Sequence, residues 1–387
     1  MLTKRVAREL CGVALAIVLL PFAAKLRAQS PVVRSPVVQW RVTELWRVDG
    51  TSSGEPFASV RDFVVARDGT VWVLDFKDQS IRRFDASGKE LARVGRKGSG
   101  PGEMRNANGL LVTNDGSVWV NDPGNSRLTV FGADGKFLRQ HVLSINGYGW
   151  QWNAWVDRRT GDVIDPFINM HPGNGTSYDW RRITSTGVVR DTFPMPTCAN
   201  GRSTAGKYYR AETKGKGSTN RSYPFAYGGG SAPTRDTAVW CASPTDTRIA
   251  LIRIGRNDTL LRTTVDVARI SVPKSDRDSA IAAAREAVSK YESNDFDVNL
   301  VPTIRSGIAS LAVDDDGHVW VQHAPRGGES SVTFDVHDRT GKHLGRLNIP
   351  HKPSTEGLVI RARGNDLWIG VRDDDDVLGI AHYRIVR

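Results

Sequence analysis

One phrase recurs along the chain and limits the folds available to it. It reads DFVVARDGTVWVLDFKDQSIRRFDASGKELARV from Asp62 to Val94 and GLLVTNDGSVWVNDPGNSRLTVFGADGKFLRQHV from Gly109 to Val142. A third copy runs from Ser310 to Leu347. Each copy holds four short alternating stretches separated by Asp-Gly, Gly-Lys or Asn-Ser turns, which is the pattern of a four-stranded antiparallel meander. The repetition predicts an all-β array of such units.

The second stretch of each unit carries an anchor residue, which in five units is a tryptophan between apolar neighbours. The anchors are Trp72, Trp119, Ile164 in a degenerate copy, Trp240, Trp320 and Trp368, which makes six units. Neighbouring anchors are 45 to 48 residues apart, except for two intervals of 76 and 80 residues. The long intervals predict insertions at about 196–225 and 266–305. We interpret the tryptophans as packing between neighbouring sheets, because large rings fill that space, and not as a ligand-binding aromatic ladder.

The last unit, from Leu358 to Val386, has room for only three strands. An alternating run without a hairpin partner, VQWRVTELWRV from Val38 to Val48, stands near the other end of the chain. Pairing of this run with the last unit would close the ring and remove exposed strand edges. The predicted fold is therefore a six-bladed β-propeller of four-stranded antiparallel blades, closed by an N-terminal strand and carrying one helical insertion.

The string GRKGSGPGEM from Gly95 to Met104, followed by VWVND, GNSRL and FGADGKFL, resembles the NHL-repeat group of six-bladed β-propellers. The resemblance is sharp over residues 60–142 and recognisable over 308–347. It implies a binding or scaffold role through a loop-rich face. Enzymes on similar six-bladed folds include lactonases that hold a divalent cation with Glu, Asn and Asp, and lyases that hold zinc with histidines.

The first 28 residues predict an exported protein. A basic start precedes an apolar stretch from Leu10 to Ala24, and the small residue Ala28 comes before Gln29, the layout of a cleaved signal peptide. We expect residues 29–387 to form the mature propeller, secreted or periplasmic and of bacterial origin. No other stretch is long and apolar enough to predict a membrane span.

Two cysteines remain in the predicted mature chain. Cys198 and Cys241 make an even pair in an oxidising compartment, and we predict a disulfide between them. Two separate buried thiols are the alternative. Neither cysteine lies in a CxxC motif or at a spacing typical of a zinc site, which argues against redox catalysis and a cysteine metal site.

One helix is expected, over Ser275 to Ser293, with Ser275 or Asp276 as its N-cap. Its apolar stripe contains Ile281, Ala284, Val288 and Tyr291, and we expect this stripe to pack on the propeller. The helix would then act as a lid or a buttress.

The other insertion is basic, with a net charge of +5 over residues 197–221. Basic groups beside tyrosines can hold phosphate, sulfate or carboxylate groups; a solvated loop is the alternative. The basic loop residues considered as ligand contacts are Arg202, Lys207, Arg210, Lys214 and Lys216. The partner expected here is a protein or an acidic glycan, and export argues against nucleic acid. A monomer is expected.

In a propeller, the loops that lead from one blade to the next gather on one face, around the central channel. Convergent polar groups at such a concave mouth are the default ligand site. An alternative is that they satisfy backbone groups around a water-filled channel. The candidates are Arg61, Asp62, Asn106, Asn108, Asn153, Arg305 and Glu356.

These patterns favour a binding or scaffold module whose ligand is anionic, such as a glycan, an envelope component or a protein. The alternative is a metal-dependent lactonase or lyase with its site at the channel. Asn108, Asn153 and Glu356, together with Asp62, would then hold a hard divalent cation such as Ca²⁺. No cofactor is predicted otherwise, and no catalytic residue is assigned.

Overall fold

The computed structural model describes residues 37–49, 55–145, 151–171, 175–196, 208–213, 217–225, 230–242, 247–256, 258–326, 331–350, 360–372 and 378–387. The predicted signal peptide, Cys198 and most of the predicted basic loop lie outside these residues. Within the described part, the repeats form the expected four-stranded antiparallel sheets, which we call blades.

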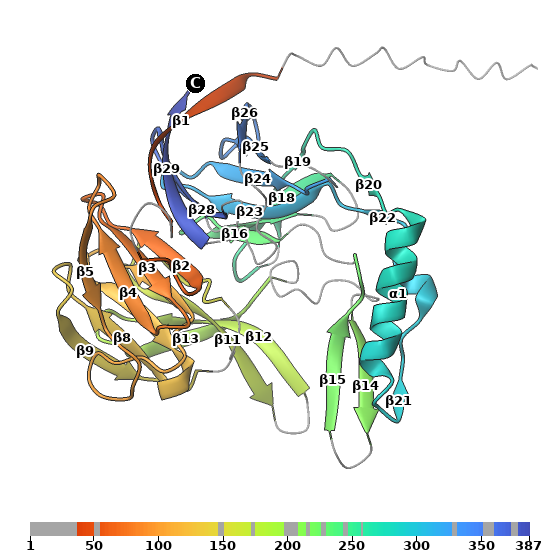
Figure 1. Cartoon of the computed structure of the whole chain (residues 1–387), viewed down its shortest axis with the longest axis horizontal. Helices are drawn as coiled ribbons and strands as arrows, with labels where there is room; N and C mark the ends of the chain where they lie inside the picture. Colours follow the sequence, from red (N-terminus) through yellow and green to blue (C-terminus); the bar gives the residue numbers. More distant parts are fainter. Residues whose placement is uncertain are drawn as a thin grey trace, which may run out of the picture. The chain divides into compact units, whose positions relative to one another are not determined.

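The first five blades each take their four strands from one stretch of the chain, as the colours of Figure 1 show. The first blade contains β2 (Val60–Val65), β3 (Val71–Asp75), β4 (Ser80–Phe84) and β5 (Glu90–Val94), and the second contains β6 (Gly109–Val112), β7 (Val118–Asp122), β8 (Arg127–Phe131) and β9 (Phe137–Val142). The third contains β10 (Trp155–Val156), β11 (Val163–His171), β12 (Gly175–Ile183) and β13 (Val189–Pro194), and the fourth contains β16 (Ser231–Pro233), β17 (Ala238–Ala242), β18 (Arg248–Arg253) and β19 (Thr259–Thr264).

The fifth blade contains β23 (Ile308–Val313), β24 (Val319–His323), β25 (Val332–His337) and β26 (His343–Ile349). The last one combines both ends of the described chain: β27 (Ile360–Arg363), β28 (Asp366–Arg372), β29 (Leu378–Val386) and β1 (Gln39–Val48). These sheets fit the predicted six blades.

The predicted N-terminal closing strand is confirmed. Strand β1 pairs antiparallel with β29, from Arg41 opposite Val386 to Val48 opposite Ile380 (Figure 1). Its first residues also pair parallel with β26, so that the fifth and last blades form one eight-stranded sheet. This pairing covers the outer edge of β29, which would otherwise be open to edge-to-edge association.

The anchors lie in the second strand of every blade and are buried, as the packing interpretation requires. The five tryptophans are at most 6% exposed, and Ile164 is fully buried. Trp72 of the first blade packs among Leu110, Val118 and Phe131 of the second. An anchor therefore fills the space between two neighbouring sheets, where a large ring removes the most apolar surface from water.

The two insertions pack on each other. The first supplies β14 (Tyr208–Thr213) and β15 (Gly217–Ser222), and the second supplies β21 (Ser293–Asn294), which pairs with β14. The helix α1 (Lys274–Val288) lies beside this sheet (Figure 1). The remaining short elements are β20 (Ile270–Ser271) paired with β22 (Ile304–Arg305), and two 3-10 turns, Pro123–Asn125 and Val298–Leu300.

The helix differs from its prediction in three respects. Its N-cap is Pro273, which has no side chain able to cap, while the Ser275 hydroxyl donates to Asp276 instead. It ends at Val288, because the following residues turn to pair Ser293 with β14. Its buried stripe packs on the tyrosines of the other insertion, Tyr209 and Tyr223, and not on the blades as expected. Among the described residues, none of the helical segments has the length and apolar character needed to cross a bilayer.

Candidate central-channel site

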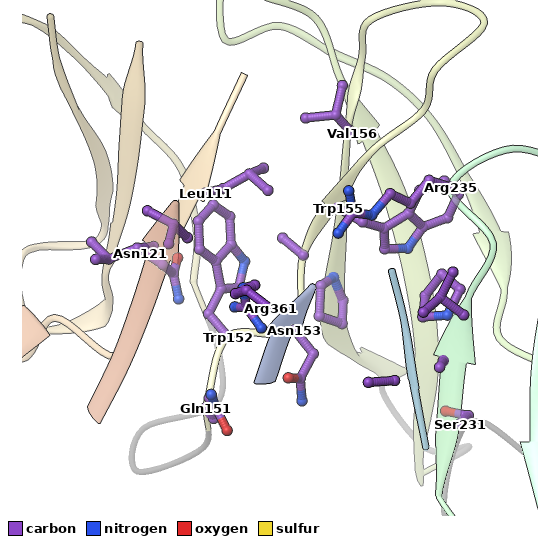
Figure 2. Close-up of a pocket in the computed structure, with 18 of the residues that line it drawn as sticks. Leu111, Asn121, Gln151, Trp152, Asn153, Trp155, Val156, Ser231, Arg235 and Arg361 are labelled. Carbon is purple, nitrogen blue, oxygen red and sulfur yellow. The ribbon is translucent and has the colours of Figure 1, made fainter. Parts of the chain in front are cut away.

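A cavity of about 1860 Å³ is bounded by residues from all the innermost strands: β2, β6, β10, β16, β23 and β27. It is therefore the central channel of the ring, and Figure 2 shows part of its lining. The described residues that line it include six arginines and one aspartate. The charged set comprises Arg67, Arg158, Arg181, Arg235, Arg361, Arg363 and Asp315.

Arg361 occupies a position that is apolar in every other blade. It lies opposite the anchor Trp368 across the pair of strands β27 and β28. The residues opposite the other anchors are Val64, Leu111, Trp155, Ala232 and Ala312, and all of them line the channel. The last blade thus places a guanidinium where the other blades place an apolar side chain.

Asp62 holds Arg361 in place from behind the lining. Arg361 Nη2 lies 3.1 Å from Asp62 Oδ1, and the guanidinium stands 5.6 Å from the centre of the Phe63 ring. Asp62 is 1% exposed, and its Oδ2 accepts a hydrogen bond of 2.9 Å from the Leu110 amide. Burial raises the pKa of Asp62, and the charge of Arg361 acts against that rise. A third of the Arg361 side chain remains exposed, at 33%.

A second set of polar side chains lines the end of the channel formed by the inner hairpin turns. In five blades the turn is closed by a backbone hydrogen bond from Ala66, Thr113, Asp157, Thr234 or Asp314. The next residue lines the channel in each case, and these residues are Arg67, Asn114, Arg158, Arg235 and Asp315. The last blade, with its shorter turn, contributes Arg363. We call these six residues the turn ring.

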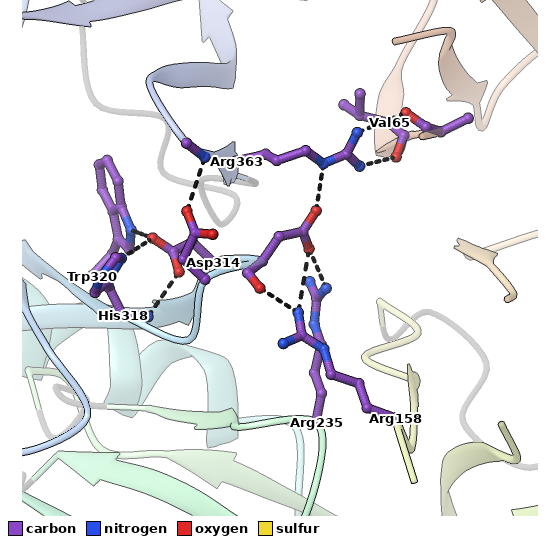
Figure 3. Close-up of polar contacts among 11 residues, drawn as sticks. Val65, Arg158, Arg235, Asp314, His318, Trp320 and Arg363 are labelled. Atoms are coloured by element: carbon purple, nitrogen blue, oxygen red, sulfur yellow. Dashed lines mark hydrogen bonds and ion pairs between the residues drawn. The ribbon is translucent and has the colours of Figure 1, made fainter. Parts of the chain in front are cut away.

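Asp315 is the only acid of the turn ring and connects its neighbours (Figure 3). Its carboxylate accepts from Arg363 Nε at 2.7 Å and pairs with Arg235, and its carbonyl accepts from Arg158 at 2.6 Å. Partial burial opposes the charge of Asp315, but Arg235 and Arg363 outweigh it and hold its pKa below the ordinary value. Arg363 also donates to the carbonyl of Ala66 at 3.1 Å. The contacts join the third, fourth, fifth, last and first blades.

The third blade leaves an opening in the channel wall. Its innermost strand has only two residues, which pair with Val163 and Ile164, while β11 continues to His171. The chain before β10 turns to the second blade instead, where the Trp152 amide donates to the Asn108 carbonyl at 3.1 Å. Pro166 lies in β11 just beyond the paired residues. Proline has no amide to donate, so it suits a strand edge that has no ladder partner.

The structure brings only some of the predicted site residues to the channel. Asn108 and Asn153 line it, and Asp62 contacts it through Arg361. Arg61 lies over the Phe76 ring at 5.2 Å, at an irregularity in the register between β2 and β3. The Asn106 amide donates to Asp122, and Arg305 belongs to β22 of the second insertion, where it donates to the Pro325 carbonyl. Glu356 lies outside the described residues.

The predicted basic loop is represented by one described residue. Arg210 is exposed in β14 and pairs with Glu212 at 2.9 Å. Arg202, Lys207, Lys214 and Lys216 lie outside the described residues. The disulfide between Cys198 and Cys241 stays a prediction, because Cys198 also lies outside them.

Two of the residues proposed for a cation, Asn108 and Asp62, already accept hydrogen bonds. Asn108 Oδ1 accepts from the Asn121 side-chain amide at 2.7 Å, and both oxygens of Asp62 accept from nitrogen donors. Another acidic group, Asp314 with Asp316 and His318, lies in an inner turn. There Asp314 accepts from His318 and from the Trp320 indole at 3.0 Å (Figure 3). The carboxylate oxygens of Asp314 are therefore used to bond the turn residue His318 and the anchor Trp320.

Sequence reasoning overlooked the arginines of the channel. The signal for Arg361 and Arg363 was present as IRAR, a charged pattern inside a predicted innermost strand. For the turn ring it was the recurrence of a basic residue two positions after the first strand of a blade, at Arg67, Arg158 and Arg235. Each turn residue in isolation is typical of a solvated loop, and only closure of the ring brings them together.

No family model matches the chain, and no curated protein matches its sequence. Solved structures similar to it include U3-55K, with a TM-score of 0.51 and 12% identity, covering 89% of this chain and 98% of that one. Virginiamycin B lyase from Staphylococcus aureus has a TM-score of 0.40 and 13% identity, over 90% of this chain and 99% of the other. Aldose sugar dehydrogenase from Streptomyces coelicolor has a TM-score of 0.45 and 12% identity, over 91% and 100%. At these identities the likeness concerns the fold alone, and the chain is a β-propeller.

Proposed function

We propose that this protein is an exported, NHL-like β-propeller that acts as a binding module and takes an anionic ligand in its central channel. The observation that carries the proposal is the lining of that channel, in which six arginines face one aspartate among the described residues. The candidate signal peptide and the NHL-like string support the compartment and the family.

The net charge of the channel favours an anion even when the two aspartates behind its lining are counted. Asp62 and Asp165 lie behind the lining, and each neutralises one arginine, Arg361 and Arg181. In the turn ring, Arg67, Arg158, Arg235 and Arg363 stand against Asp315 alone. A cleft with one sign of charge between walls of low dielectric concentrates the field and raises the local concentration of the opposite ion.

Guanidinium groups also fit the chemistry of the expected ligand. Their planar forks bind carboxylate, sulfate and phosphate groups with paired hydrogen bonds. Arg361 is held in the wall by Asp62 while a third of its side chain stays exposed, so the chain positions this donor before the ligand arrives. The exposed Asn153 and the half-buried Gln151 at the same cavity add neutral hydrogen-bonding groups.

The donor set supports this proposal over a metal-dependent lactonase or lyase. A hard divalent cation prefers free carboxylate and amide oxygens, whereas Asn108 and Asp62 already accept hydrogen bonds. The cation would also lie among arginines, which repel it. We expect the mature chain to show the same melting temperature with chelator as with added Ca²⁺. A near-stoichiometric metal whose removal lowers the melting temperature would instead favour the enzyme.

The proposal is tested by calorimetric titration of the chain from Gln29 with inorganic sulfate at low ionic strength. We expect saturable binding that weakens with salt, and a loss of about tenfold in affinity for Arg361→Gln and for Arg67→Gln. Arg262→Gln is the matched control, because Arg262 is exposed in β19, away from the channel. Removal of Arg361 leaves Asp62 buried without its partner, so Asp62→Asn with Arg361→Gln is the folded comparison. Equal sulfate binding by this double variant and the control would refute the proposal.

A further inference from the structure

The channel differs along its length at the third blade. Arg361 lies opposite an anchor, and the anchor of the third blade is Ile164, so the two residues stand at corresponding levels of their blades. The turn ring lies on one side of this level. On the other side, β11 continues from Asp165 through Pro166 and Phe167, and none of the described residues forms an innermost strand beside it.

The opening in the third blade exposes an apolar surface to the channel. Pro166, Phe167, Ile168, Trp180 and Met195 all line the cavity, and we call them the blade-three wall. Trp180 packs edge-on against Trp155 at 6.1 Å between ring centres, which gives the wall a rigid backing. In the first and fifth blades, by contrast, the innermost strand pairs with the second strand for three residues beyond the anchor, up to Asp75 and His323.

The wall contains a charge that is already matched. Arg181 lies 5.3 Å from the centre of the Phe167 ring, and its Nε pairs with the buried Asp165 at 2.5 Å. Asp165 also accepts from the Trp152 indole at 2.6 Å, and Arg181 donates to the Ser144 carbonyl at 2.8 Å. The blade-three wall therefore presents aromatic and aliphatic surface beside a neutral ion pair.

The first insertion extends the cavity boundary beyond the blades. Tyr208 and Asn220, from β14 and β15, belong to the cavity lining. The alternate residues Tyr209 and Ala211 of β14 are buried against α1. The helix thus supports a hairpin whose other face lies toward the channel, so it serves as a buttress for a cavity wall.

The size of the cavity agrees with a ligand that uses both regions. At about 1860 Å³ it exceeds the range of roughly 300 to 1,000 Å³ that is usual for small-molecule pockets. A small inorganic anion would leave most of the volume, and all of the blade-three wall, in contact with water.

We infer that the ligand is an amphipathic anion, with its anionic group at Arg361 and the turn ring and its apolar portion against the blade-three wall. This inference rests on the proposed function and adds the class of ligand. Such a molecule would lie along the channel, because the arginines and the blade-three wall stand at different levels of the blades. Burial of its apolar part supplies affinity, while Arg361 fixes its orientation.

The test uses alkanesulfonates of increasing length, which keep one anionic group and change only the apolar part. Calorimetric titrations of the mature chain with methanesulfonate, 1-butanesulfonate and 1-octanesulfonate should show affinity rising by up to about fourfold for each methylene buried. Arg361→Gln should weaken the binding of all three compounds. Phe167→Ser should weaken 1-octanesulfonate by about tenfold and leave methanesulfonate unchanged.

Phe137→Ser is the matched control, because Phe137 is 37% exposed in the outer strand β9. Met195→Gln, a change of similar volume on the same wall, replaces Phe167→Ser if that variant does not fold. Equal affinity for the short and long sulfonates would overturn the inference and leave anion binding intact. Unchanged 1-octanesulfonate binding in both wall variants would also overturn it. Failure of the wild-type chain to bind any sulfonate would refute the proposed function itself.

Discussion

The hydroxyl of Tyr383 donates a hydrogen bond of 2.9 Å to Glu44, which lies 339 positions earlier in the chain. The two residues belong to the strands that close the ring, where Glu44 stands directly opposite Tyr383 in the register of β1 and β29. Tyr383 is 1% exposed, and burial together with the Glu44 carboxylate raises the pKa of its hydroxyl. The hydroxyl therefore remains a donor throughout the neutral range.

We expect Tyr383→Phe to lower the free energy of unfolding by about 1 to 2 kcal/mol, because it removes a hydrogen bond to a charged acceptor at the closing seam. Urea denaturation of the mature chain measures this change. Tyr291→Phe, in the partly buried stretch after α1, is the control and should stay near the wild-type value. Equal midpoints for both variants would show that the contact contributes nothing to closure.

Stability should fall as the pH is lowered from about 7 to about 5. His382 stacks on Trp368 with ring centres 4.4 Å apart and faces Asp366 and Arg384. Burial lowers the pKa of His382, and the Asp366 carboxylate partly opposes this shift. Burial likewise lowers the pKa values of His141 and His337. As the pH falls, each histidine binds a proton in the unfolded chain before it does so in the folded protein. Its contribution to stability is therefore present above about pH 6.5 and is lost below that pH.

Melting temperatures across this pH range measure the effect. His382→Phe keeps a ring on Trp368 but removes the titration, so its melting temperature should depend less steeply on pH than that of the wild type. Parallel curves for the two proteins would contradict the assignment to His382.

Gly109 allows the chain before the third blade to approach the second. A Cβ atom at Gly109 would lie 2.4 Å from the Cβ of Trp152, a distance that real side chains do not reach. We expect Gly109→Ala to displace Trp152, which lines the channel, and to destabilise the protein by about 1 to 3 kcal/mol. Urea denaturation and tryptophan fluorescence measure the two effects.

Gly116→Ala is the comparison for this variant. It has open space around the new methyl group but a φ of +82°, so it tests backbone strain without a collision. A change in tryptophan fluorescence is expected only for Gly109→Ala. The same fluorescence in both variants would exclude a displacement of Trp152.

Asp315→Asn should destabilise the ring and strengthen anion binding at the same time. The substitution removes the carboxylate that pairs with Arg235 and Arg363, which we expect to cost about 2 to 4 kcal/mol, while the Arg158 hydrogen bond to the backbone carbonyl is kept. Because salt screens the repulsion among partly exposed arginines, the loss of unfolding free energy should become smaller as ionic strength rises. The affinity for sulfate at low salt should rise severalfold, as measured by calorimetry.

Asp278→Asn is the control for Asp315→Asn, since Asp278 is an exposed residue of α1 that pairs with Lys274. It removes the same formal charge far along the chain from the turn ring, and we expect neither a loss of stability nor a gain in sulfate affinity. A gain of equal size in both variants would trace the effect to net charge and not to the channel.

Much of the fold follows from local patterns. The period-two alternation and the Asp-Gly turns predict the strands of a blade, and the position of Trp72 or Trp119 within a unit predicts which strand packs between sheets. The unpaired run from Val38 to Val48 predicts closure, because an alternating strand without a hairpin partner must find one elsewhere. All these features depend on residues within a single repeat or on the number of repeats.

The candidate site depended on relations between repeats. The positions of Asn108 and Asn153 in the repeat predict their place at the channel. The same reasoning fails for Arg61, which lies at an irregularity in the pairing of β2, and for Arg305, which belongs to an insertion. The helix illustrates the same limit. Its apolar stripe predicts that one face is buried, but not which segment covers that face. In the structure, Tyr209 and Tyr223 of the other insertion cover it.

The blade, the anchor and the closing strand can all be predicted from local patterns, because hydrophobic alternation and turn chemistry act over a few residues. The folded ring is needed to see that Arg361 and the turn ring surround one channel and that the third blade places an apolar wall beside them. Those features arise when six separate strands converge on one axis, and the charge or gap at any one of them acquires meaning only from the other five.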